Sequence, residues 1–589
     1  MHKFLSPALL GLGLVSTACR SKTEQPITPS ALESRANHTQ ASDDPPPLRE
    51  QAEDPADTGT AMSLTEGKMG KKDPQHSQQE AIEQARTAGV VGATATGSYG
   101  TIGQGQAGAF GMGRGAGVAD VSSGFDASNL AGAEAYHDWG KNPWTDASKD
   151  QLSTFAADVD TASYTIARRK LNEGTLPPPA AVRVEEFVNY FRYAFPAPAA
   201  STPFAVVMDA APSPLSPGHH ILRVGVATRP KSVAERKPAH LVFLVDVSDS
   251  MASPDKLELA KRSLRILTDN LKDGDTVSLV TYAGDSRLVL PPTGLAHKAQ
   301  ILAAIEELHT GGSTAMASGI DLAYQQAMKG LVPGAISRVI VCTDGDANVG
   351  SHTHDEILRI IAGRAKEGVT LSTIGFGMGN YKDELMEQLA DKGNGNNFYI
   401  DSLSAAKKVF QEQLGGTLEV VAKDVKLQVD FDPQLVSRYR LIGYENRDIR
   451  DDDFRNDRVD AGEIGAGHQV TAVYDVELTA RGKLAHAPLG SIRIRHKQPT
   501  AEKATEAAFP MIGGATESFA NAPTDFRFAF AVAAFADVLR GGPDAEHWSL
   551  AEIRDLARRA AGDDADRTEL VGLIERAIAY RKAQVRAGG

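Results

Sequence analysis

Residues 241–414 alternate between short apolar runs and amphipathic stretches, and this alternation constrains the fold more than any other feature of the chain. Runs such as LVFLVDV (241–247), TVSLVTYA (276–283) and SRVIVCTD (337–344) are mostly apolar, which is typical of strands buried on both faces. Stretches with helical periodicity follow them, among them MASGIDLAYQQAMKG (316–330). Strands and helices in this alternation predict a doubly wound α/β domain whose mostly parallel sheet is covered by helices on both faces.

Three polar motifs interrupt this block where strands end or helices begin. Asp246, Ser248 and Ser250 leave the first strand at alternate positions, Thr314 lies in the Gly loop TGGSTAM, and Asp344 closes the strand that ends in CTD. Ligands of open parallel sheets bind at the carboxyl ends of the strands, so we expect these side chains at one edge. Carboxylate and hydroxyl oxygens suit Mg²⁺, Mn²⁺ or Ca²⁺ better than zinc. An ion held by so few carboxylates stays positively charged and favours one more anionic ligand from outside.

The three motifs, in this order, resemble the metal-ion-dependent adhesion site of von Willebrand factor type A domains. The resemblance covers about residues 238–416, and five positions match the site: Asp246, Ser248, Ser250, Thr314 and Asp344. It implies a Rossmann-like fold in which the two Ser side chains bind the ion directly, while the Asp and Thr side chains bind it directly or through water. Mg²⁺ is the ion we expect first, with Mn²⁺ or Ca²⁺ as alternatives. The resemblance also implies that an Asp or Glu of a protein partner completes the coordination shell.

Strand-like runs on both sides of this domain, at 197–237 and 417–500, predict a β-sandwich into which the domain is inserted. In DVKLQVDF (424–431), for example, apolar and polar residues alternate with the period of a half-buried strand. We expect an N-terminal helical segment at 136–196 and a C-terminal helical domain at 501–589.

The N-terminal helical segment contains a second acidic motif, Asp158-Val-Asp160. We interpret Asp160 as the N-cap of the helix that follows rather than as a metal ligand. The stretch from 155 to 193 and the helical tail resemble bacterial exported von Willebrand A lipoproteins that are sometimes labelled calcium-activated chloride channel homologues. That label brings no transport activity here, because no apolar segment of membrane-spanning length follows the first residues.

The first residues predict export. Lys3 and a short apolar run precede Ser-Thr-Ala-Cys, which resembles the lipobox of bacterial lipoproteins, so we expect a signal peptide over 1–19 and lipid on Cys19. Residues 20–135 are rich in Pro, Ser and Gln and then in Gly, which predicts a disordered linker. The expected location is the bacterial cell envelope, periplasmic or surface-exposed. Cys342 lies in an apolar strand and is expected to be a buried thiol.

Composition and motifs narrow the function. The net charge of -13 argues against nucleic acid as a partner, because phosphate binding needs a basic surface. The sequence lacks a Gly-x-Ser-x-Gly elbow, a His-Glu-x-x-His motif and a P-loop, so we expect no enzyme. We expect a lipid-anchored protein that binds a partner through its metal ion. The alternatives are an envelope structural or assembly factor with a purely structural metal and, less favoured, a metal-assisted enzyme or a channel component.

Overall fold

A computed structural model describes residues 134–588, apart from 200–201, 346–353, 378, 414–415, 417 and 486. All described residues belong to one compact unit, 119–589. The predicted signal peptide, Cys19 and the linker as far as residue 133 lie outside the described residues.

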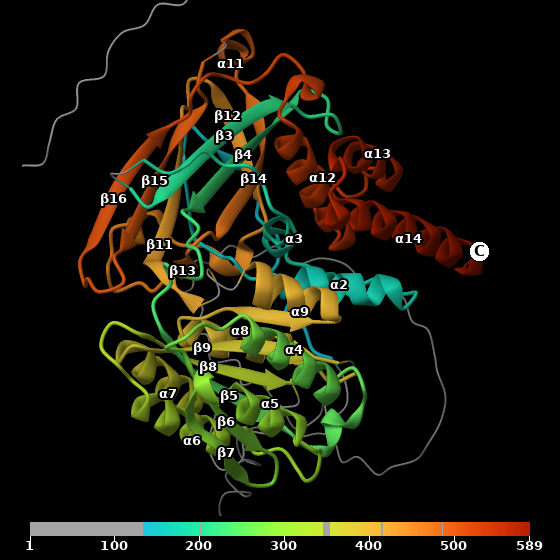
Figure 1. The fold of residues 1–589 in the computed structure, drawn as a ribbon. Coiled ribbons are helices and arrows are strands. Elements are labelled where there is room, and N and C mark those ends of the chain that lie inside the picture. Colours follow the sequence, from blue (N-terminus) through green and yellow to red (C-terminus); the bar gives the residue numbers. More distant parts are fainter. Residues whose placement is uncertain are drawn as a thin grey trace, which may run out of the picture. The chain divides into compact units, whose positions relative to one another are not determined.

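The central domain is built on a six-stranded sheet with the order β10-β9-β8-β5-β6-β7, of which β9, β8, β5, β6 and β7 are labelled in Figure 1. Its strands are β5 (Ala239–Asp246), β6 (Thr276–Tyr282), β7 (Ser286–Gly294), β8 (Ile336–Thr343), β9 (Val369–Phe376) and β10 (Asn397–Ile400). All pairings are parallel except that of β7 with β6, which is antiparallel. The chain leaves β5 toward β6 on one side and returns to β8 on the other, so the sheet has its topological switch point between β5 and β8.

Helices cover both faces of this sheet. The apolar run of β5 requires this, because successive side chains of a strand point to opposite faces and all of those in β5 are buried. Leu241, Phe243 and Val245 belong to one core, whereas Val242 and Leu244 belong to a second. The first core contains residues of α4 (Leu257–Asp269), α5 (Lys298–Glu306) and α9 (Leu403–Lys407), which continues as the π-helical turn η5 (Lys408–Glu412). The second contains residues of α6 (Met316–Lys329), α7 (His354–Lys366) and α8 (Asp383–Lys392). The α/β von Willebrand A fold predicted from sequence is confirmed.

Two antiparallel sheets flank this domain in the sequence and share one apolar core. The first has the order β1-β12-β14-β4-β3, and the second has the order β13-β11-β15-β16, with β2 also paired to β11. Their strands are β1 (Thr145–Asp146), β2 (Leu152–Ala156), β3 (Phe204–Pro212), β4 (His219–Thr228), β11 (Val420–Phe431), β12 (Val436–Ile442), β13 (Gly462–Gly465), β14 (Gln469–Leu478), β15 (Gly490–Lys497) and β16 (Ala504–Pro510). Because β4 pairs with β14, strands from before and after the central domain complete a common sheet.

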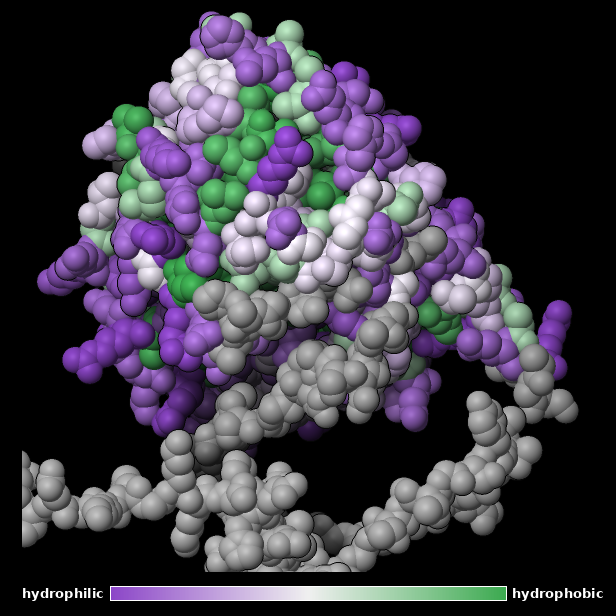
Figure 2. Space-filling view, turned by 90° about the horizontal axis from the view of Figure 1, so that it is seen from below, coloured by the Kyte–Doolittle hydropathy of each residue, from purple (hydrophilic) through white to green (hydrophobic). Residues whose placement is uncertain are grey.

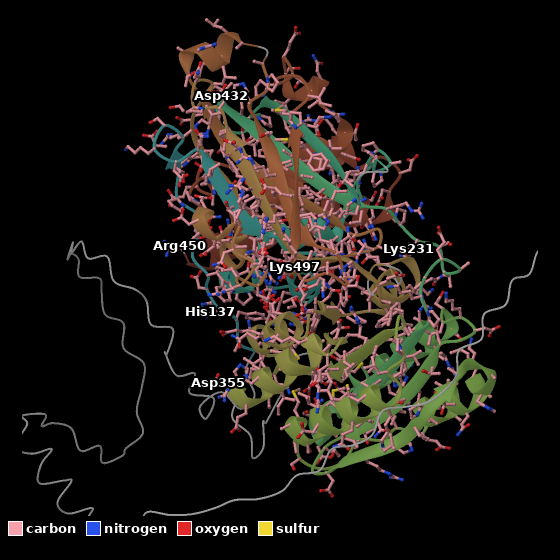
Figure 3. All side chains as sticks on the ribbon, turned by 90° about the vertical axis from the view of Figure 1, so that its left-hand side faces the viewer. His137, Lys231, Asp355, Asp432, Arg450 and Lys497 are labelled. Carbon is pink, nitrogen blue, oxygen red and sulfur yellow. The ribbon has the colours of Figure 1, made fainter. Side chains whose placement is uncertain are left out.

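The two connections between this sandwich and the central domain lie together. Lys231, labelled in Figure 3, follows β4, and Glu419 precedes β11. Their side chains form an ion pair with 2.7 Å between Nζ and Oε1, and the other Glu419 oxygen accepts the backbone N–H of Lys237. The central domain is therefore an insertion whose two ends are tied to each other.

A fourth apolar core joins helices from both ends of the described chain. The helices are α2 (Ala162–Asn172), α3 (Val184–Tyr190), α12 (Thr524–Leu539), α13 (Leu550–Ala561) and α14 (Ala565–Gly588). Almost every side chain of α12 is buried, as expected for a helix that is apolar nearly all round. Short elements complete the described chain: η2 (Pro179–Ala181), η3 (Asp249–Ala252), η4 (Leu295–His297), η6 (Glu445–Arg447), η7 (Asp451–Asp453), α11 (Ala480–Leu484) and η8 (Phe519–Asn521).

The structure differs from the sequence-based expectation at three places. Asp160 is not an N-cap, because Thr161 holds that position and Oδ1 of Asp160 instead accepts the backbone N–H of Asn397. Residues 504–510 form an edge strand, β16, within the range expected to be helical. Ala135, placed in the linker, forms a β-bridge with Lys382. Asp160 and Ala135 have partners far away in the sequence, which a local pattern does not contain. The strand β16 instead pairs with its neighbour in the sequence, β15.

The described surface is mainly polar, and Figure 2 shows one face on which hydrophilic residues surround smaller apolar patches. The large apolar side chains that are exposed come from separate elements: Trp139, Val233, Leu288, Val332, Leu403, Leu484 and Ile512. None of the helices in the described part of the chain combines the length and the apolar character needed to cross a membrane.

Candidate metal site

Asp246 is the last residue of β5 and lies at the switch point of the central sheet. Its side chain is fully buried, and both carboxylate oxygens accept a hydrogen bond: Oδ1 from the backbone N–H of Ser248 and Oδ2 from the hydroxyl of Thr343, each at 2.9 Å. Burial raises the pKa of Asp246 to about 6, although the hydrogen bonds from Ser248 oppose this shift, and the nearby charge of Asp344 adds to it. A raised pKa in a fully buried carboxylate indicates a position where a cation would be stabilising.

The two Ser side chains of the first motif lie next to each other. Ser248 is buried, Ser250 is half-buried, and their hydroxyl oxygens are 3.0 Å apart. The chain makes the 3₁₀ turn η3 here, and the N–H of Met251 donates to the carbonyl of Ser248. Ser248 still has extended backbone, with φ −63° and ψ 163°, so the alternation of side chains along β5 continues from Asp246 to Ser248 before the turn begins. The structure thus brings Asp246, Ser248 and Ser250 together.

The Gly loop that carries Thr314 is bound to the first motif through the backbone. The N–H of Gly311 donates to the carbonyl of Val247 at 2.8 Å, and the N–H of Asp249 donates to the carbonyl of Gly312 at 3.0 Å. Gly312 has a φ of +92°, a conformation that favours glycine. Thr314 is half-buried just before α6, and within the described residues its hydroxyl has no side-chain hydrogen bond. Thr314 is therefore brought to this edge by its loop, with an oxygen available to a ligand.

Asp344 follows β8, the neighbour of β5, and is also fully buried. Its Oδ2 accepts hydrogen bonds from Nζ of Lys256 at 2.9 Å and from Nδ2 of Asn380 at 3.0 Å. The chain turns at Gly345, whose φ is +83°, and an added Cβ there would lie 2.7 Å from the backbone nitrogen of Lys382. Only glycine fits this turn, which directs the chain away while leaving the Asp344 carboxylate at the sheet edge.

Three residues that the motifs did not include support this site. Thr343 holds Asp246, while Lys256 and Asn380 hold Asp344. Thr343 is adjacent to a motif residue, so its position in CTD is a usable signal in the sequence. Lys256 and Asn380 carry no such signal, because one precedes a helix and the other lies in a loop far from the motifs.

The donor set suits a hard divalent cation. Two carboxylates and three hydroxyls lie at the end of β5, in the turn after it, in the loop before α6 and directly after β8. They offer the oxygen ligands that Mg²⁺, Mn²⁺ and Ca²⁺ prefer. Within the described ranges, no group of three or more His, Cys, Asp or Glu side chains is arranged to hold a metal ion. A metal at this edge would therefore depend on the Ser and Thr hydroxyls in addition to the two Asp residues.

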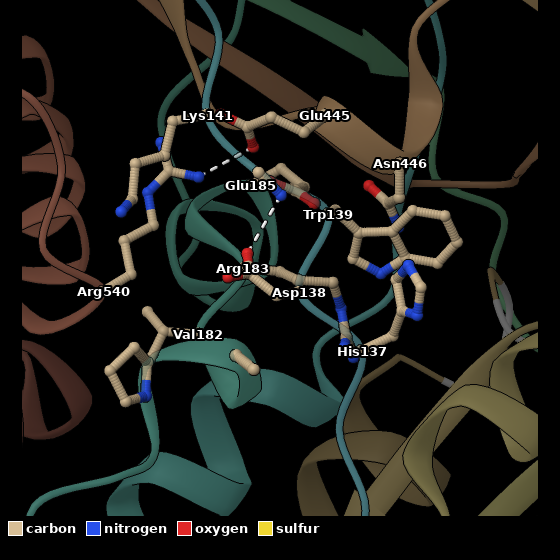
Figure 4. Close-up of a pocket in the computed structure, with 13 residues that line it drawn as sticks. His137, Asp138, Trp139, Lys141, Val182, Arg183, Glu185, Glu445, Asn446 and Arg540 are labelled. Carbon is tan, nitrogen blue, oxygen red and sulfur yellow. Dashed lines mark hydrogen bonds and ion pairs between the residues drawn. The ribbon is translucent and has the colours of Figure 1, made fainter. Parts of the chain in front are cut away.

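A separate cavity lies away from these residues, where the N-terminal segment, α3 and the end of α12 meet (Figure 4). Its volume is about 60 Å³, and Glu185, Glu445 and Arg540 are among its lining residues. Arg540 donates to Glu445 at 2.7 Å, so the charges that line it are partly paired with each other. A cavity of this size holds a few water molecules at most, and none of the five predicted metal ligands lines it.

Comparisons with known proteins identify three matching regions. Residues 240–412 match the family model of the von Willebrand factor type A domain, and residues 130–223 match a model described as von Willebrand factor. Residues 416–579 match the model described as "Uncharacterized protein YfbK, C-terminal".

Relatives match over differing lengths. "Uncharacterized protein YfbK" of Escherichia coli (strain K12) is 41% identical over 471 residues, which are 75% of this chain and 81% of that relative. "Uncharacterized protein sll0103" of Synechocystis sp. is 28% identical over 213 residues, 36% of this chain and 50% of its own length. The solved structure "von Willebrand factor type A from Catenulispora acidiphila" covers 64% of this chain and 89% of its own, with 18% identity and a TM-score of 0.37. The extent and identity of the first match, together with the family models that match residues 240–412 and 416–579, place this chain in the YfbK family of proteins with a von Willebrand factor type A domain.

Proposed function

We propose that this protein is a metal-dependent binding protein of the bacterial cell envelope. Its von Willebrand A domain would hold a divalent cation, most readily Mg²⁺, and bind a partner protein through an Asp or Glu of that partner. The proposed ligands are the two carboxylates and three hydroxyls at the sheet edge: Asp246, Ser248, Ser250, Thr314 and Asp344. The observation that carries the proposal is the buried Asp246 carboxylate beside two Ser hydroxyls 3.0 Å apart.

The chemistry of the donors supports binding rather than catalysis as the role of the ion. Three of the five donors are neutral hydroxyls, so the two carboxylates only just balance a bound divalent cation, and the cation can still accept a further anionic ligand. The Asp246 carboxylate already accepts two hydrogen bonds, which hold it as a ligand and do not suit it to accept a substrate proton. An acidic side chain of a partner is the ligand that this arrangement favours.

Metal binding is tested by titrating the full chain with Mg²⁺ in a calorimeter, comparing wild type with Asp246→Ala. Asp249→Ala is the matched control, because Asp249 lies in the same turn with an exposed side chain. Wild type and Asp249→Ala should bind Mg²⁺, and Asp246→Ala should not. Mg²⁺ at a hundredfold excess over its dissociation constant should raise the unfolding free energy of wild type by about 2.7 kcal/mol. An unchanged isotherm for Asp246→Ala would exclude the site.

Partner binding is tested by capture from an envelope extract with Mg²⁺ or with EDTA. Thr314→Ala should reduce capture in Mg²⁺, whereas Thr314→Ser keeps the hydroxyl and should preserve it. The four measurements are wild type in Mg²⁺, wild type in EDTA, Thr314→Ala in Mg²⁺ and Thr314→Ser in Mg²⁺. If the same protein is captured equally in all four while Mg²⁺ still stabilises the fold, the metal is structural. That result would favour the alternative of an envelope structural or assembly factor.

We further propose that Cys19 carries lipid and attaches the protein to a bacterial membrane. The support is the short apolar run that ends at Ser-Thr-Ala-Cys. One acyl chain binds a membrane only weakly, so stable attachment needs more than one chain on this residue. The linker sequence between Cys19 and residue 134 would then give the binding domain reach from the membrane surface.

A further inference from the structure

The ammonium group of Lys256 lies at the candidate metal site and is fixed there. Lys256 is 7% exposed, and its Nζ donates to three acceptors: the carbonyl of Ser250 at 3.0 Å, Oδ2 of Asp344 at 2.9 Å and Oδ1 of Asn380 at 3.1 Å. A lysine ammonium has three protons, so each proton has a partner. Two of these three partners belong to proposed metal-ligand residues.

The aliphatic part of Lys256 is held as firmly as its charge. It packs against Gly377, whose φ is +71°, and an added Cβ at Gly377 would lie 2.1 Å from Cγ of Lys256. The loop that contains Gly377 also carries Asn380, which donates to the same Asp344 oxygen. The loop therefore confines the Lys256 side chain through Gly377. Through Asn380 it also donates to the same Asp344 oxygen that accepts the Lys256 ammonium.

Residues outside the von Willebrand A domain hold this loop in place. Nη1 of Arg169, in α2, donates to the carbonyl of Gly377 at 3.1 Å, and the N–H of Gly379 donates to Oε1 of Glu134 at 3.1 Å. Glu134 also pairs with Arg169 and Lys170, each at 2.7 Å. The position of Lys256 is thus built into the larger protein and does not depend on the central domain alone.

The ammonium group of Lys256 changes the net charge of the candidate metal site. Asp246 and Asp344 together contribute two negative charges and Lys256 one positive charge, so the metal-free site carries one net negative charge. A divalent cation would change this to one net positive charge, which a single carboxylate would neutralise. Two further acids lie nearby in the sequence. Asp249 is exposed, so solvent screens it. Asp255 keeps its charge, but its Oδ1 accepts the hydroxyl of Ser253 and it is not among the three acceptors of the Lys256 ammonium.

We propose that Lys256 sets the charge of the metal site, so that it weakens metal binding and makes the loaded site select a ligand with one negative charge. This inference rests on the proposed metal site and adds a residue that the motif does not contain. Without Lys256 the loaded site would be neutral and would have little electrostatic attraction for a carboxylate. Lys256 acts through charge and through Asp344, and it does not bind the metal itself.

The test compares Lys256→Met with Asn380→Leu in the full chain. Both substitutions remove one hydrogen bond to Oδ2 of Asp344, but only the first removes a charge. Calorimetric titration should give a Mg²⁺ affinity at least about tenfold tighter for Lys256→Met than for Asn380→Leu, because a fixed positive charge a few ångströms from the ion has been removed. Lys256→Gln is neutral but keeps a donor, and the same comparison applies to it if Lys256→Met does not fold.

Ligand selection is measured with acetate as the probe on Mn²⁺-loaded protein, using water-proton relaxation to detect displacement of bound water. Wild type and Asn380→Leu should bind acetate, and Lys256→Met should bind it about tenfold more weakly. Equal Mg²⁺ or equal acetate affinities for Lys256→Met and Asn380→Leu would overturn the inference while leaving the metal site intact. Flat Mg²⁺ isotherms for wild type and all variants would overturn the proposed metal site and, with it, this inference.

Discussion

The hydroxyl of Thr343 donates a hydrogen bond to Oδ2 of Asp246 across 2.9 Å. Thr343 ends β8 and Asp246 ends β5, two strands that pair in parallel at the switch point of the sheet. The bond therefore links the carboxyl ends of the two strands from which both proposed Asp ligands extend. It also stabilises the ionised form of Asp246 against the burial that raises its pKa to about 6.

Replacing Thr343 with Val should weaken Mg²⁺ binding about tenfold, because a hydrogen bond to a charged group contributes about 1.5 kcal/mol. The loss has two parts, a less fixed Asp246 carboxylate and a stronger competition from protons for it. Calorimetric titration at pH 7.5 measures the change, and Thr343→Ser, which keeps the hydroxyl, should bind like wild type. Equal affinities for the Val and Ser variants would contradict this role of the hydroxyl.

Arg183 should contribute strongly to stability, because it neutralises several buried carboxylates between α3 and α8. It is 5% exposed and pairs with Asp383 and Glu186, with Glu387 within 3.7 Å. Arg183→Met would leave Asp383 and Glu186 buried without their cation, at a cost of about 3–5 kcal/mol in unfolding free energy. Denaturant unfolding of the full chain measures this cost.

The matched control for Arg183 is Arg364→Met. Arg364 pairs with Glu367 at 2.8 Å, and their side chains are 40% and 48% exposed. Solvent-exposed pairs of this kind contribute about 1 kcal/mol or less, so this variant should unfold nearly like wild type. Similar losses in the two variants would show that the buried cluster has no special importance.

The raised pKa of Glu185 predicts that the stability of the folded protein falls as pH rises from 5 to 8. It is 1% exposed, and burial raises its pKa from 4.5 to about 7, with the charge of Glu445 adding to the shift. Between these two values the folded protein binds more protons than the unfolded chain, so its stability decreases as pH rises. The contribution is fully present below pH 4.5 and is lost as pH rises through about 7.

Glu185→Gln should therefore raise the unfolding free energy at pH 8 by an amount on the order of 2 kcal/mol, with no gain at pH 5. The Gln carbonyl can still accept the N–H of Tyr444, which donates to Glu185 at 2.8 Å. Thermal unfolding of wild type and variant across this pH range provides the measurement. Glu367→Gln, at an exposed position, is the control. If the difference in unfolding free energy between Glu185→Gln and wild type did not change with pH, the raised pKa of Glu185 would be refuted.

Cys19→Ala should move the protein from the membrane fraction to the soluble fraction when it is expressed in a bacterial host. The physical reason is the loss of acyl chains, each of which contributes about 0.8 kcal/mol per buried methylene. Cell fractionation and metabolic labelling with an alkyne fatty acid measure location and acylation. Ser21→Ala is the neighbouring control, and continued membrane partition of the Cys19 variant would disprove the anchor.

The α/β fold of the central domain and the place of the candidate site along the chain could be predicted from the sequence, because the relevant signals are local. An apolar run followed at once by Asp246, Ser248 and Ser250 contains both a strand and the tight turn after it. The order of the three motifs then predicts one sheet edge, because parallel strands must all end on the same side. No such local signal marks β7 or β16, whose polar and apolar residues do not distinguish an edge strand from a loop.

Supporting residues could not be predicted in this way. Lys256 lies 88 residues from Asp344 and 124 from Asn380, and its local sequence is that of an ordinary exposed lysine before a helix. The role of Asp160 could not be predicted either. Its position in the sequence suits an N-cap, but its carboxylate accepts the backbone N–H of Asn397. A side chain with several local options takes the one that burial and distant partners stabilise most.

The sequence by itself determined where the proposed metal ligands lie along the chain, because strand ends, glycine turns and oxygen donors are encoded within a few residues. Only the tertiary structure decided the charge and rigidity around them. Burial removes water from Asp246 and Asp344, so their charges act on whatever the fold places beside them. The fold placed Lys256 there, held by a loop that residues from outside the domain secure.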